Sequence, residues 1–307
     1  MNTALYFIHA LSPLHAGTGQ SVGAIDLPIA RERPTGIPLV PGSSIKGALR
    51  ARYDRPDKHT IFGPDTENAA EFAGAVQFSD AHLLLLPVRS IAGTFAWVTS
   101  PYLLQRFARD ANQAQWKNLL LPTGPQNVGE CLTAKEAAIR TKVNNTPKVL
   151  LEDFDFSPST VDRDEKAVAN LADKVGTLLF PNETGDEEWR KMLKARLCIV
   201  HDDVMAVLLE TATEVVARIR LDENTKTVSK GALWYEESLP TESVLYGLVA
   251  ATGVSQQGVK EGSKRQVMTL QELLAAVEKT STGMLQLGGK STVGRGVCQF
   301  RMKAGVA

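Results

Sequence analysis

A long polar loop near the N-terminus constrains this chain more than any other feature. Residues 14–50 read LHAGTGQSVGAIDLPIARERPTGIPLVPGSSIKGALR, a stretch rich in glycine and proline that ends in a short basic helix. A loop of this length costs conformational entropy and buries little apolar surface, so a chain that builds only a core has little use for it. We therefore predict that this stretch carries the function.

The charge balance excludes a protein that is drawn as a whole to polyanions. Lys plus Arg and Asp plus Glu each number 34 in 307 residues, so any binding to nucleic acid must come from local patches. A hydrophobic share of 43% supports a large core, in one elaborated domain or two small ones. The three cysteines are never in a CxxC pair, and no apolar segment reaches the roughly 20 residues that span a bilayer. We expect a soluble, cytoplasmic protein with no membrane partner.

Short hydrophobic patterns predict a mixture of strands and helices. Residues 4–11 (ALYFIHAL) are typical of a buried strand, in which His9 is a packed core histidine. Residues 100–114 predict an amphipathic helix, with Ser100 as its cap and Pro101 at its first position. Further strands are expected at 76–78, 83–88 and 149–156, and further helices at 164–180 and 186–197.

Asp26 is the acid that most needs an explanation, because it lies between Ile25 and Leu27 in an apolar setting. One interpretation is an Asx-turn or the end of a strand. The other is a carboxylate presented at a loop tip, where it could orient a hydroxyl or hold a divalent ion. The sequence leaves both open. In the preceding LHAGTG, the glycines would let the backbone approach a phosphate closely.

The PGSSIKGALR segment predicts a site for a phosphate group. Ser43 or Ser44 would cap a helix that starts near Ile45, after the Pro-Gly turn. Lys46 and Arg50 are four residues apart and share one face of that helix. Capped N–H groups followed by two cations suit a phosphate, and the alternative is a solvated basic face.

Residues 214–221 (EVVARIRL) predict a strand with Arg218 and Arg220 on one face. A polar turn at 222–230 follows, and residues 231–252 return as a strand. The result is a hairpin that projects from the body with Lys226 and Lys230 at its tip. Such an arm suits contact with a polymer or a neighbouring subunit.

A glycine-rich basic loop near the C-terminus, residues 288–295, holds Gly288, Gly289 and Lys290, followed by Ser291, Thr292 and Arg295. It is similar to a phosphate-binding P-loop, but the first glycine is out of register and the loop runs toward a strand, so ATP binding is not expected. Its N–H groups and cations could still cradle a phosphodiester. The triplet at 201–203 (HDD) lacks the further histidines that a metal phosphohydrolase needs.

These motifs together resemble the RAMP superfamily, the RNA-binding proteins of CRISPR systems, and most of all the repeated backbone subunit of the type III-B (Cmr) effector complex. The motifs are LHAGTG, GAIDLPIARE, PGSSIKGALR, GTFAWVTSPYLLQRF, IRLDENTKTVSKGALWYEE and GGKSTVGRG. The resemblance implies an α+β fold with a modified RRM or ferredoxin-like core. It further implies a single elaborated domain over 1–307, with helical insertions at about 112–213 and a thumb-like hairpin at about 214–240.

The resemblance also implies a function. Copies would stack along a guide RNA (crRNA) beside other type III-B subunits, each thumb would interrupt guide–target pairing, and the complementary target RNA would be cut. Asp26 would be the catalytic residue and would bind a divalent metal, Mg²⁺ or Mn²⁺. The cut would leave a 2′,3′-cyclic phosphate and a 5′-hydroxyl. The expected RNA-binding residues are His15, Gly17, Ser43, Ser44, Lys46, Arg50, Arg218, Arg220, Lys226, Gly288, Gly289, Lys290, Ser291, Thr292 and Arg295.

Two alternative functions remain open at this point. One is a purely structural RNA-binding subunit of the same kind of complex, with cleavage performed elsewhere. The other is a guide-processing ribonuclease that works without metal through His9, His15 or Tyr53. Resistance of the activity to EDTA would favour the second.

Overall fold

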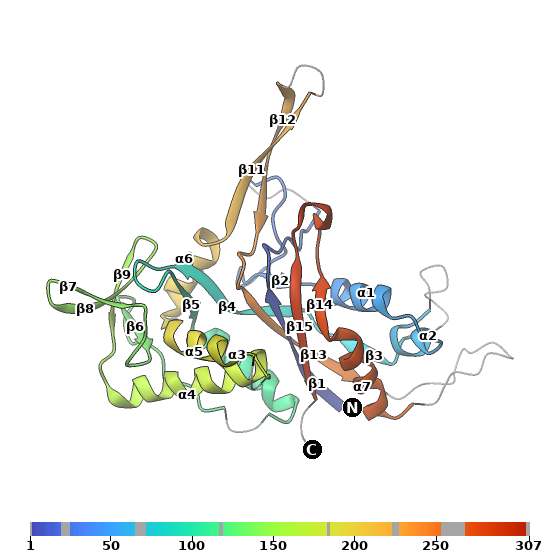
Figure 1. Cartoon of the computed structure of the whole chain (residues 1–307), viewed down its shortest axis with the longest axis horizontal. Helices are drawn as coiled ribbons and strands as arrows, with labels where there is room; N and C mark the ends of the chain where they lie inside the picture. The colour runs from blue at the N-terminus through green and yellow to red at the C-terminus, as the bar shows by residue number, and fades with distance from the viewer. Residues whose placement is uncertain are drawn as a thin grey trace.

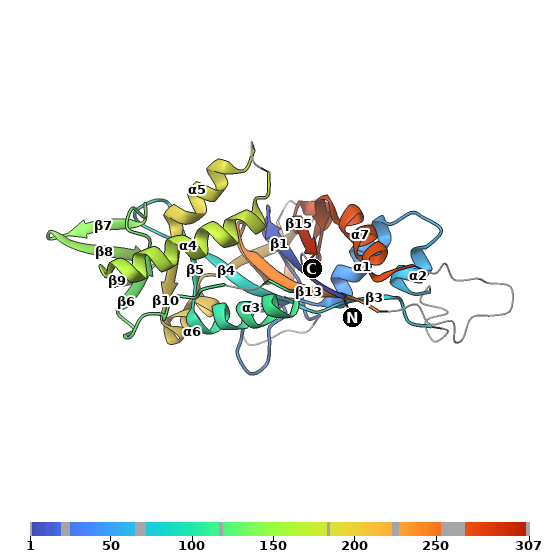
Figure 2. The same cartoon turned by 90° about the horizontal axis from the view of Figure 1, so that it is seen from below.

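The computed structural model describes residues 2–19, 25–64, 72–116, 119–182, 185–222, 227–252 and 268–304. A large mixed sheet runs through the molecule, and a two-stranded hairpin projects from it (Figure 1). Helices α3 to α6 lie toward one end of the molecule, and α1, α2 and α7 lie toward the other (Figure 2). Within the described residues, no helix has both the length and the apolar character that crossing a membrane requires.

An inner strand of the sheet is β1 (Asn2–Ala10), which pairs antiparallel with both β13 (Val244–Ala251) and β15 (Val297–Ala304). Alternating side chains of a strand point to opposite faces, and here both faces are covered. Tyr6 belongs to one buried cluster, while Leu5 and Phe7 belong to the other. This two-sided burial explains why the predicted strand at 4–11 is an almost continuous apolar run.

Each face of the sheet is covered by its own helices. On the Tyr6 face lie α1 (Gly42–Arg52) and α7 (Leu270–Ser281), with α2 (Lys58–Phe62) nearby. On the other face, α3 (Pro101–Gln113) and α4 (Asp162–Leu179) pack their apolar stripes, and α5 (Glu187–Arg196) packs against α4. The predicted helices at 100–114, 164–180 and 186–197 are confirmed. Ser100 is the N-terminal flanking residue of α3, but its side chain accepts no capping hydrogen bond there.

The strand order along the sheet is β14-β15-β1-β13-β4-β5-β10-β6-β9-β8-β7, with β2 beside β4 and β3 beside β13. The strands not yet given bounds are β2 (Leu39–Val40), β3 (Val76–Phe78), β4 (Ala81–Arg89), β5 (Phe95–Thr99), β6 (Glu130–Thr133), β7 (Arg140–Val143), β8 (Thr146–Leu151), β9 (Phe154–Pro158), β10 (Leu197–Val200) and β14 (Gly283–Gln286).

Two predicted strands are each divided into two strands in the structure. The strand predicted at 149–156 is the hairpin of β8 and β9, which turns at Glu152, a residue with a φ of 46°. The returning strand predicted at 231–252 is divided into β12 (Val228–Ser238) and β13. Pro240 and Glu242, whose φ is 75°, lie in the break, and neither conformation continues a strand.

The thumb hairpin consists of β11 (Glu214–Leu221) and β12, paired antiparallel, and it stands clear of the body in Figure 1. Helix α6 (Asp202–Thr211) leads into it directly. The α+β fold and the projecting hairpin expected from the sequence are confirmed.

Candidate nucleic-acid interface

The loop that follows β1 is attached to the foot of the thumb hairpin. Leu14 and Leu239 exchange backbone hydrogen bonds of 2.9 Å each. Leu27 donates its N–H to the Tyr235 carbonyl at 3.1 Å and accepts from the Glu237 N–H at 2.9 Å. The sequence-distant loop and hairpin are therefore one unit, and residues 26–27 run beside β12.

Asp26 is presented at this junction as an exposed side chain. Its Oδ2 atom accepts a hydrogen bond from the backbone N–H of Tyr235 at 2.8 Å. This bond crosses to the thumb hairpin, so the carboxylate does not close a local Asx-turn. The geometry orients a charged, solvent-facing carboxylate at the point where the hairpin leaves the body.

His15 joins three segments and is buried. Its Nδ1 lies 2.7 Å from the Glu237 carbonyl, and because that oxygen can only accept, Nδ1 carries the proton. The His15 carbonyl accepts from the Gly289 N–H at 2.9 Å. A side chain at Gly288, whose φ is +73°, would collide with that same carbonyl, and one at Gly17 would collide with the imidazole ring. His15, Gly17, Gly288 and Gly289, four residues predicted to bind RNA, thus also hold the junction together.

The late glycine loop (residues 288–295) is joined to the thumb hairpin by ion pairs. Lys290 Nζ lies 2.8 Å from Glu236 Oε1, and Arg295 lies 3.2 Å from Glu214. Arg218, on β11, approaches Glu236 at 3.3 Å. Burial tends to raise the pKa of Glu236, but Lys290, the indole N–H of Trp234 and Arg218 outweigh it and hold this pKa below its usual value. Three of the predicted RNA-binding cations are thus partnered by acids.

The tip of the late glycine loop is exposed and turns through a single 3₁₀ turn, Ser291–Val293. Ser291 and Thr292 both face solvent there. Because the turn leads into β15 and not into an α-helix, the P-loop geometry is absent from this segment, in line with the prediction.

Helix α1 has a different start from the one predicted. It begins at Gly42, and neither Ser43 nor Ser44 caps it, since both are exposed within its first turn and the N-cap is Pro41. The Gly42 N–H is instead satisfied by Asp80 Oδ1 at 2.8 Å. Proximity of the Phe78 and Ser79 carbonyls leaves no room for a side chain at Gly42, which explains why glycine is needed at this position.

Lys46 is half-buried on α1 and makes no ion pair or hydrogen bond with any residue that the structure describes. Burial, and then the neighbouring Arg50, lower the pKa of its ammonium group. The Arg50 guanidinium donates to the Gly63 carbonyl. Lys46 is therefore an unneutralised cation held at a partly desolvated surface, a state that an anionic ligand would relieve.

Of the two remaining predicted RNA-binding cations on the hairpin, only one lies within the residues that the structure describes. Arg220 is exposed on β11, and Lys226 lies outside the described residues. The remaining candidates for metal-free catalysis are spread apart. His9 is buried, with its Nε2 2.6 Å from Glu242, and burial followed by the hydrogen bond to Asp57 raises the pKa of Tyr53 to about 12. These two residues and His15 each have separate partners, so they do not assemble one acid–base site.

A second acidic residue at the junction, Glu237, was not predicted, because no local pattern in the sequence marks it. It is 2% exposed, its Oε1 lies 2.5 Å from Arg31, and its Oε2 accepts from the Ile29 N–H at 3.0 Å. Arg31 also donates to the Leu209 carbonyl at 2.9 Å. This pair fixes the loop that carries Asp26 against both the thumb hairpin and α6, and only the fold brings the three segments together.

The acidic side chains at the junction determine which divalent metal site is possible there. Among the described residues no group of three or more His, Cys, Asp or Glu side chains is placed to hold a metal ion. Glu236 and Glu237 are engaged by cations, which leaves Asp26 as a single exposed carboxylate. One carboxylate suits Mg²⁺ that keeps its water and shares RNA oxygens as ligands, and it does not suit a metal held by protein groups alone.

A curled sheet with a projecting hairpin, and a carboxylate and basic helix beside it, define a RAMP-type protein. The chain belongs to the RAMP superfamily, whose profile it matches over residues 7–299. It is 35% identical, over 99% of its length and 96% of the relative's, to the CRISPR system Cmr endoribonuclease Cmr4 of Pyrococcus furiosus.

Solved structures share the fold. The crystal structure of oligomeric Cmr4 from Pyrococcus furiosus matches with a TM-score of 0.73 at 30% identity, with both chains covered in full. A type III-B Cmr-beta complex bound to cognate target RNA matches with a TM-score of 0.68 at 22% identity, over 98% of this chain and 97% of that one.

Proposed function

We propose that this chain is the repeated backbone subunit of a type III-B CRISPR ribonucleoprotein, active in the cytoplasm. Copies would stack along a guide RNA beside other subunits of the complex and cut the complementary target RNA. The similarity to the Cmr endoribonuclease supports this proposal. The single observation that carries its enzymatic half is Asp26, an exposed carboxylate hydrogen-bonded to the thumb hairpin at Tyr235.

The proposed chemistry uses the hairpin and Asp26 together. The hairpin displaces a target nucleotide, and the strand beside it bends until a 2′-oxygen lines up with its own phosphate. The 2′-oxygen bonds to phosphorus, the bond from phosphorus to the 5′-oxygen breaks, and the departing 5′-oxygen takes a proton from water. Asp26 would orient the 2′-hydroxyl and accept its proton, a contribution of about 10²- to 10⁴-fold in rate. The bent geometry would supply much of the remainder.

Guide binding is assigned to the basic side of α1 and to the late glycine loop. Lys46 supplies a cation without an acidic partner among the described residues, and the exposed tip at Ser291 and Thr292 supplies backbone N–H groups and hydroxyls. A divalent ion, Mg²⁺ or Mn²⁺, would be held by Asp26 with RNA oxygens and would stabilise charge on the reacting phosphate.

The decisive substitution is Asp26→Asn in the assembled complex with guide RNA and labelled target. We expect cutting to slow at least 100-fold while target affinity stays within about twofold, because the amide keeps the side-chain shape and loses the charge. Asp153→Asn, an exposed acid in the β8–β9 turn, is the matched control and should cut normally. Unchanged cutting at every site by Asp26→Asn would remove Asp26 from the reaction and leave a structural subunit.

Chelation separates the proposed reaction from metal-free processing. EDTA should stop target cutting by the intact complex, and added Mg²⁺ or Mn²⁺ should restore it. Cutting that continues in EDTA would instead support the guide-processing alternative, for which the separate positions of His9 and Tyr53 give no support.

A further inference from the structure

A hollow of about 310 Å³ lies where the C-terminal ends of α1 and α7 meet, and its walls are basic. Figure 2 shows these two helices together with α2 at one end of the molecule. Arg52, Arg55 and Lys279 line the hollow, and Asp54 is the one acid among the described residues that line it. Three cations against one carboxylate give the walls a formal charge of +2.

Both arginines of this α1–α7 hollow are held in place by groups other than carboxylates. The Arg52 guanidinium donates to the carbonyls of Met284 at 2.8 Å and Thr282 at 3.0 Å, which uses two of its five N–H groups. The Arg55 guanidinium lies 5.9 Å from the centroid of the Tyr53 ring, and Tyr53 is buried. An anion that enters the hollow would therefore meet guanidinium groups that are already partly ordered, which lowers the entropic cost of binding.

Lys279 adds a cation without a partner. It is exposed in the last turn of α7, and it makes neither an ion pair nor a hydrogen bond with any residue that the structure describes. The dipole of a helix favours cations near its C-terminus, and this alone accounts for Lys279 and Arg52. It does not account for Arg55, which lies three residues beyond the end of α1 and still lines the same hollow.

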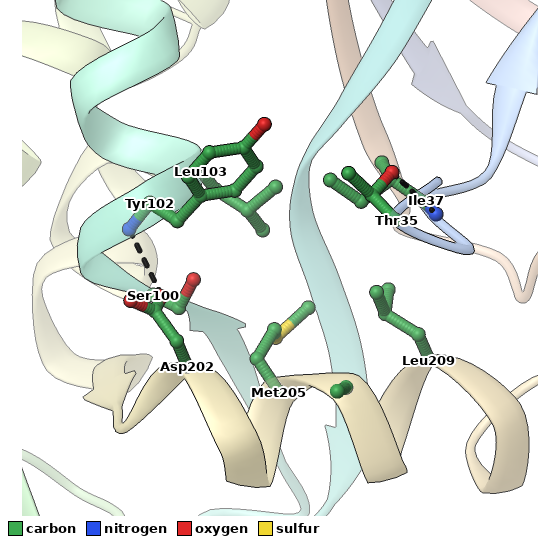
Figure 3. Close-up of a pocket in the computed structure, with 9 residues that line it drawn as sticks. Thr35, Ile37, Ser100, Tyr102, Leu103, Asp202, Met205 and Leu209 are labelled. Carbon is green, nitrogen blue, oxygen red and sulfur yellow. Dashed lines mark hydrogen bonds between the residues drawn. The ribbon is translucent and has the colours of Figure 1, made fainter. Parts of the chain in front are cut away.

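Two further hollows differ in charge. Figure 3 shows the hollow of about 290 Å³ between α3 and α6, where Leu103 and Met205 contribute apolar walls and Asp202 is the one charged residue among the described residues that line it. A hollow of about 390 Å³ between α4 and α5 is lined by four lysines. Three of these are paired with carboxylates at 2.7 to 2.8 Å, namely Lys166 with Asp162, Lys191 with Glu187 and Lys194 with Asp173. Among the described residues that line the three hollows, cations without a carboxylate partner are concentrated between α1 and α7.

We propose that the α1–α7 hollow binds a dianionic phosphate group, as a phosphomonoester or as inorganic phosphate. A phosphomonoester carries a charge of about −1.5 to −2 at pH 7, which matches the excess positive charge of the walls. A phosphodiester within an RNA strand carries a single negative charge and matches it less well. Guanidinium groups present their N–H donors in a planar fork that fits phosphate oxygens. A nucleotide, free phosphate and the phosphorylated end of an RNA share this chemistry.

The hollow is separate from the guide-binding face assigned to α1. Arg52 follows Arg50 by two positions, which is about 200° around the helix axis. Their contacts differ accordingly, since Arg50 donates to the Gly63 carbonyl and Arg52 donates to Met284 on β14. Phosphate binding in the hollow therefore does not depend on how Lys46 and its face of α1 bind a guide.

Isothermal titration calorimetry of the full-length chain tests the match of charge. The ligands are inorganic phosphate, adenosine 5′-monophosphate (AMP), adenosine, and the dinucleotide ApA, whose only phosphate is a diester. We expect AMP to bind at least about tenfold more tightly than ApA, and adenosine to give no binding. The difference in affinity between a 5′-phosphorylated RNA tetranucleotide and its 5′-hydroxyl counterpart, compared with AMP and free phosphate, identifies the preferred source. No binding of phosphate or AMP at millimolar concentration, or equal affinities for AMP and ApA, would overturn the proposal.

Substitutions assign the binding to this hollow. Lys279→Gln removes an exposed cation that has no described partner, so it should leave the melting temperature unchanged and weaken AMP binding about tenfold, the effect of losing one charge-assisted hydrogen bond. Arg55→Gln should weaken AMP binding as much. Lys142→Gln, at an exposed position on β7, is the matched control and should bind AMP as the wild type does. Wild-type affinity in Lys279→Gln would mean that this cation only complements the end of α7, and the proposal would be wrong.

Lys46→Ala separates this site from the proposed function. We expect it to weaken guide RNA binding and to leave AMP binding unchanged. If guide RNA binding is unchanged while Lys279→Gln still loses AMP, the assignment of Lys46 to the guide fails and the phosphate site stands. If Lys46→Ala loses AMP as strongly as Lys279→Gln does, phosphate binds on the guide face and the α1–α7 hollow is not its site.

Discussion

Lys46 and Lys290 were predicted from sequence to hold the guide, yet the structure gives them opposite electrostatic settings. Lys46 has no acidic partner among the described residues, whereas Lys290 lies 2.8 Å from the buried Glu236 carboxylate. Replacing each lysine by alanine should therefore affect RNA binding differently. Lys142→Ala, on the exposed β7–β8 hairpin, provides the control.

The expected change in the salt dependence of RNA binding follows from counterion release. One single-strand phosphate contact contributes about 0.7 to the slope of log affinity against log salt. Between 50 and 200 mM salt, losing that contact makes the affinity fall about 2.6-fold less than it does for the wild type. Lys46→Ala should show this full change. Lys290→Ala should show much less, since its charge is already largely neutralised by Glu236.

The effects on folding stability should be the reverse of the effects on RNA binding, with Lys290→Ala destabilising the protein and Lys46→Ala not. The pKa of Lys46 is lowered by burial and by Arg50, so its charged form opposes folding and removing it should leave the melting temperature unchanged or higher. Removing Lys290 strips a partner from buried Glu236 and should cost about 1 kcal/mol, a figure already discounted for the partial exposure of the lysine. Lys46 should thus matter mainly for RNA binding, and Lys290 mainly for folding stability.

Fluorescence anisotropy with a labelled single-stranded guide at several KCl concentrations gives the slopes, and thermal unfolding gives the stabilities. An equal loss of slope for Lys46→Ala and Lys290→Ala would refute this reasoning. It would mean that Lys290 leaves Glu236 and transfers to a phosphate when RNA arrives.

Three further outcomes follow from buried contacts. Burial, then Arg106, lowers the pKa of His82, so the unfolded chain binds the proton more readily and stability should fall as pH drops through about 6.5; His82→Gln should reduce that fall between pH 7.5 and 5.5 in thermal unfolding. Gly288→Ala should lower the melting temperature and weaken guide binding more than Gly294→Ala, because both have positive φ but only the first meets a neighbouring backbone; equal losses would argue against the His15 contact. Asp80→Ala removes the cap of α1 and should cost about 1 kcal/mol in denaturant unfolding, and no change would show that water caps the helix equally well.

Local periodicity was enough to predict much of the fold. The alternation in residues 214–221 and the apolar stripe of residues 100–114 are properties of short segments, and both elements form as predicted. The reversal between β8 and β9 was missed, because Glu152 adopts its positive φ in a sequence that otherwise has the pattern of a strand. No periodicity rule contains that information.

The candidate site was predictable in its residue types but not in its partners. Asp26 stood out as an acid in an apolar setting, yet its bond to Tyr235 spans 209 positions. The ion pair between Lys290 and Glu236 and the cap from Asp80 to α1 also join distant segments. Such contacts depend on which strands become neighbours in the sheet, and this is why the serine cap was predicted wrongly.

The hydrogen bond from the β12 backbone couples the position of the Asp26 carboxylate to that of the hairpin. In a row of identical copies this hairpin and carboxylate would recur at the subunit repeat, and so would the cleaved phosphodiester bonds. The spacing between scission points would then be a length measured out by protein geometry, the same for every transcript whatever its base composition.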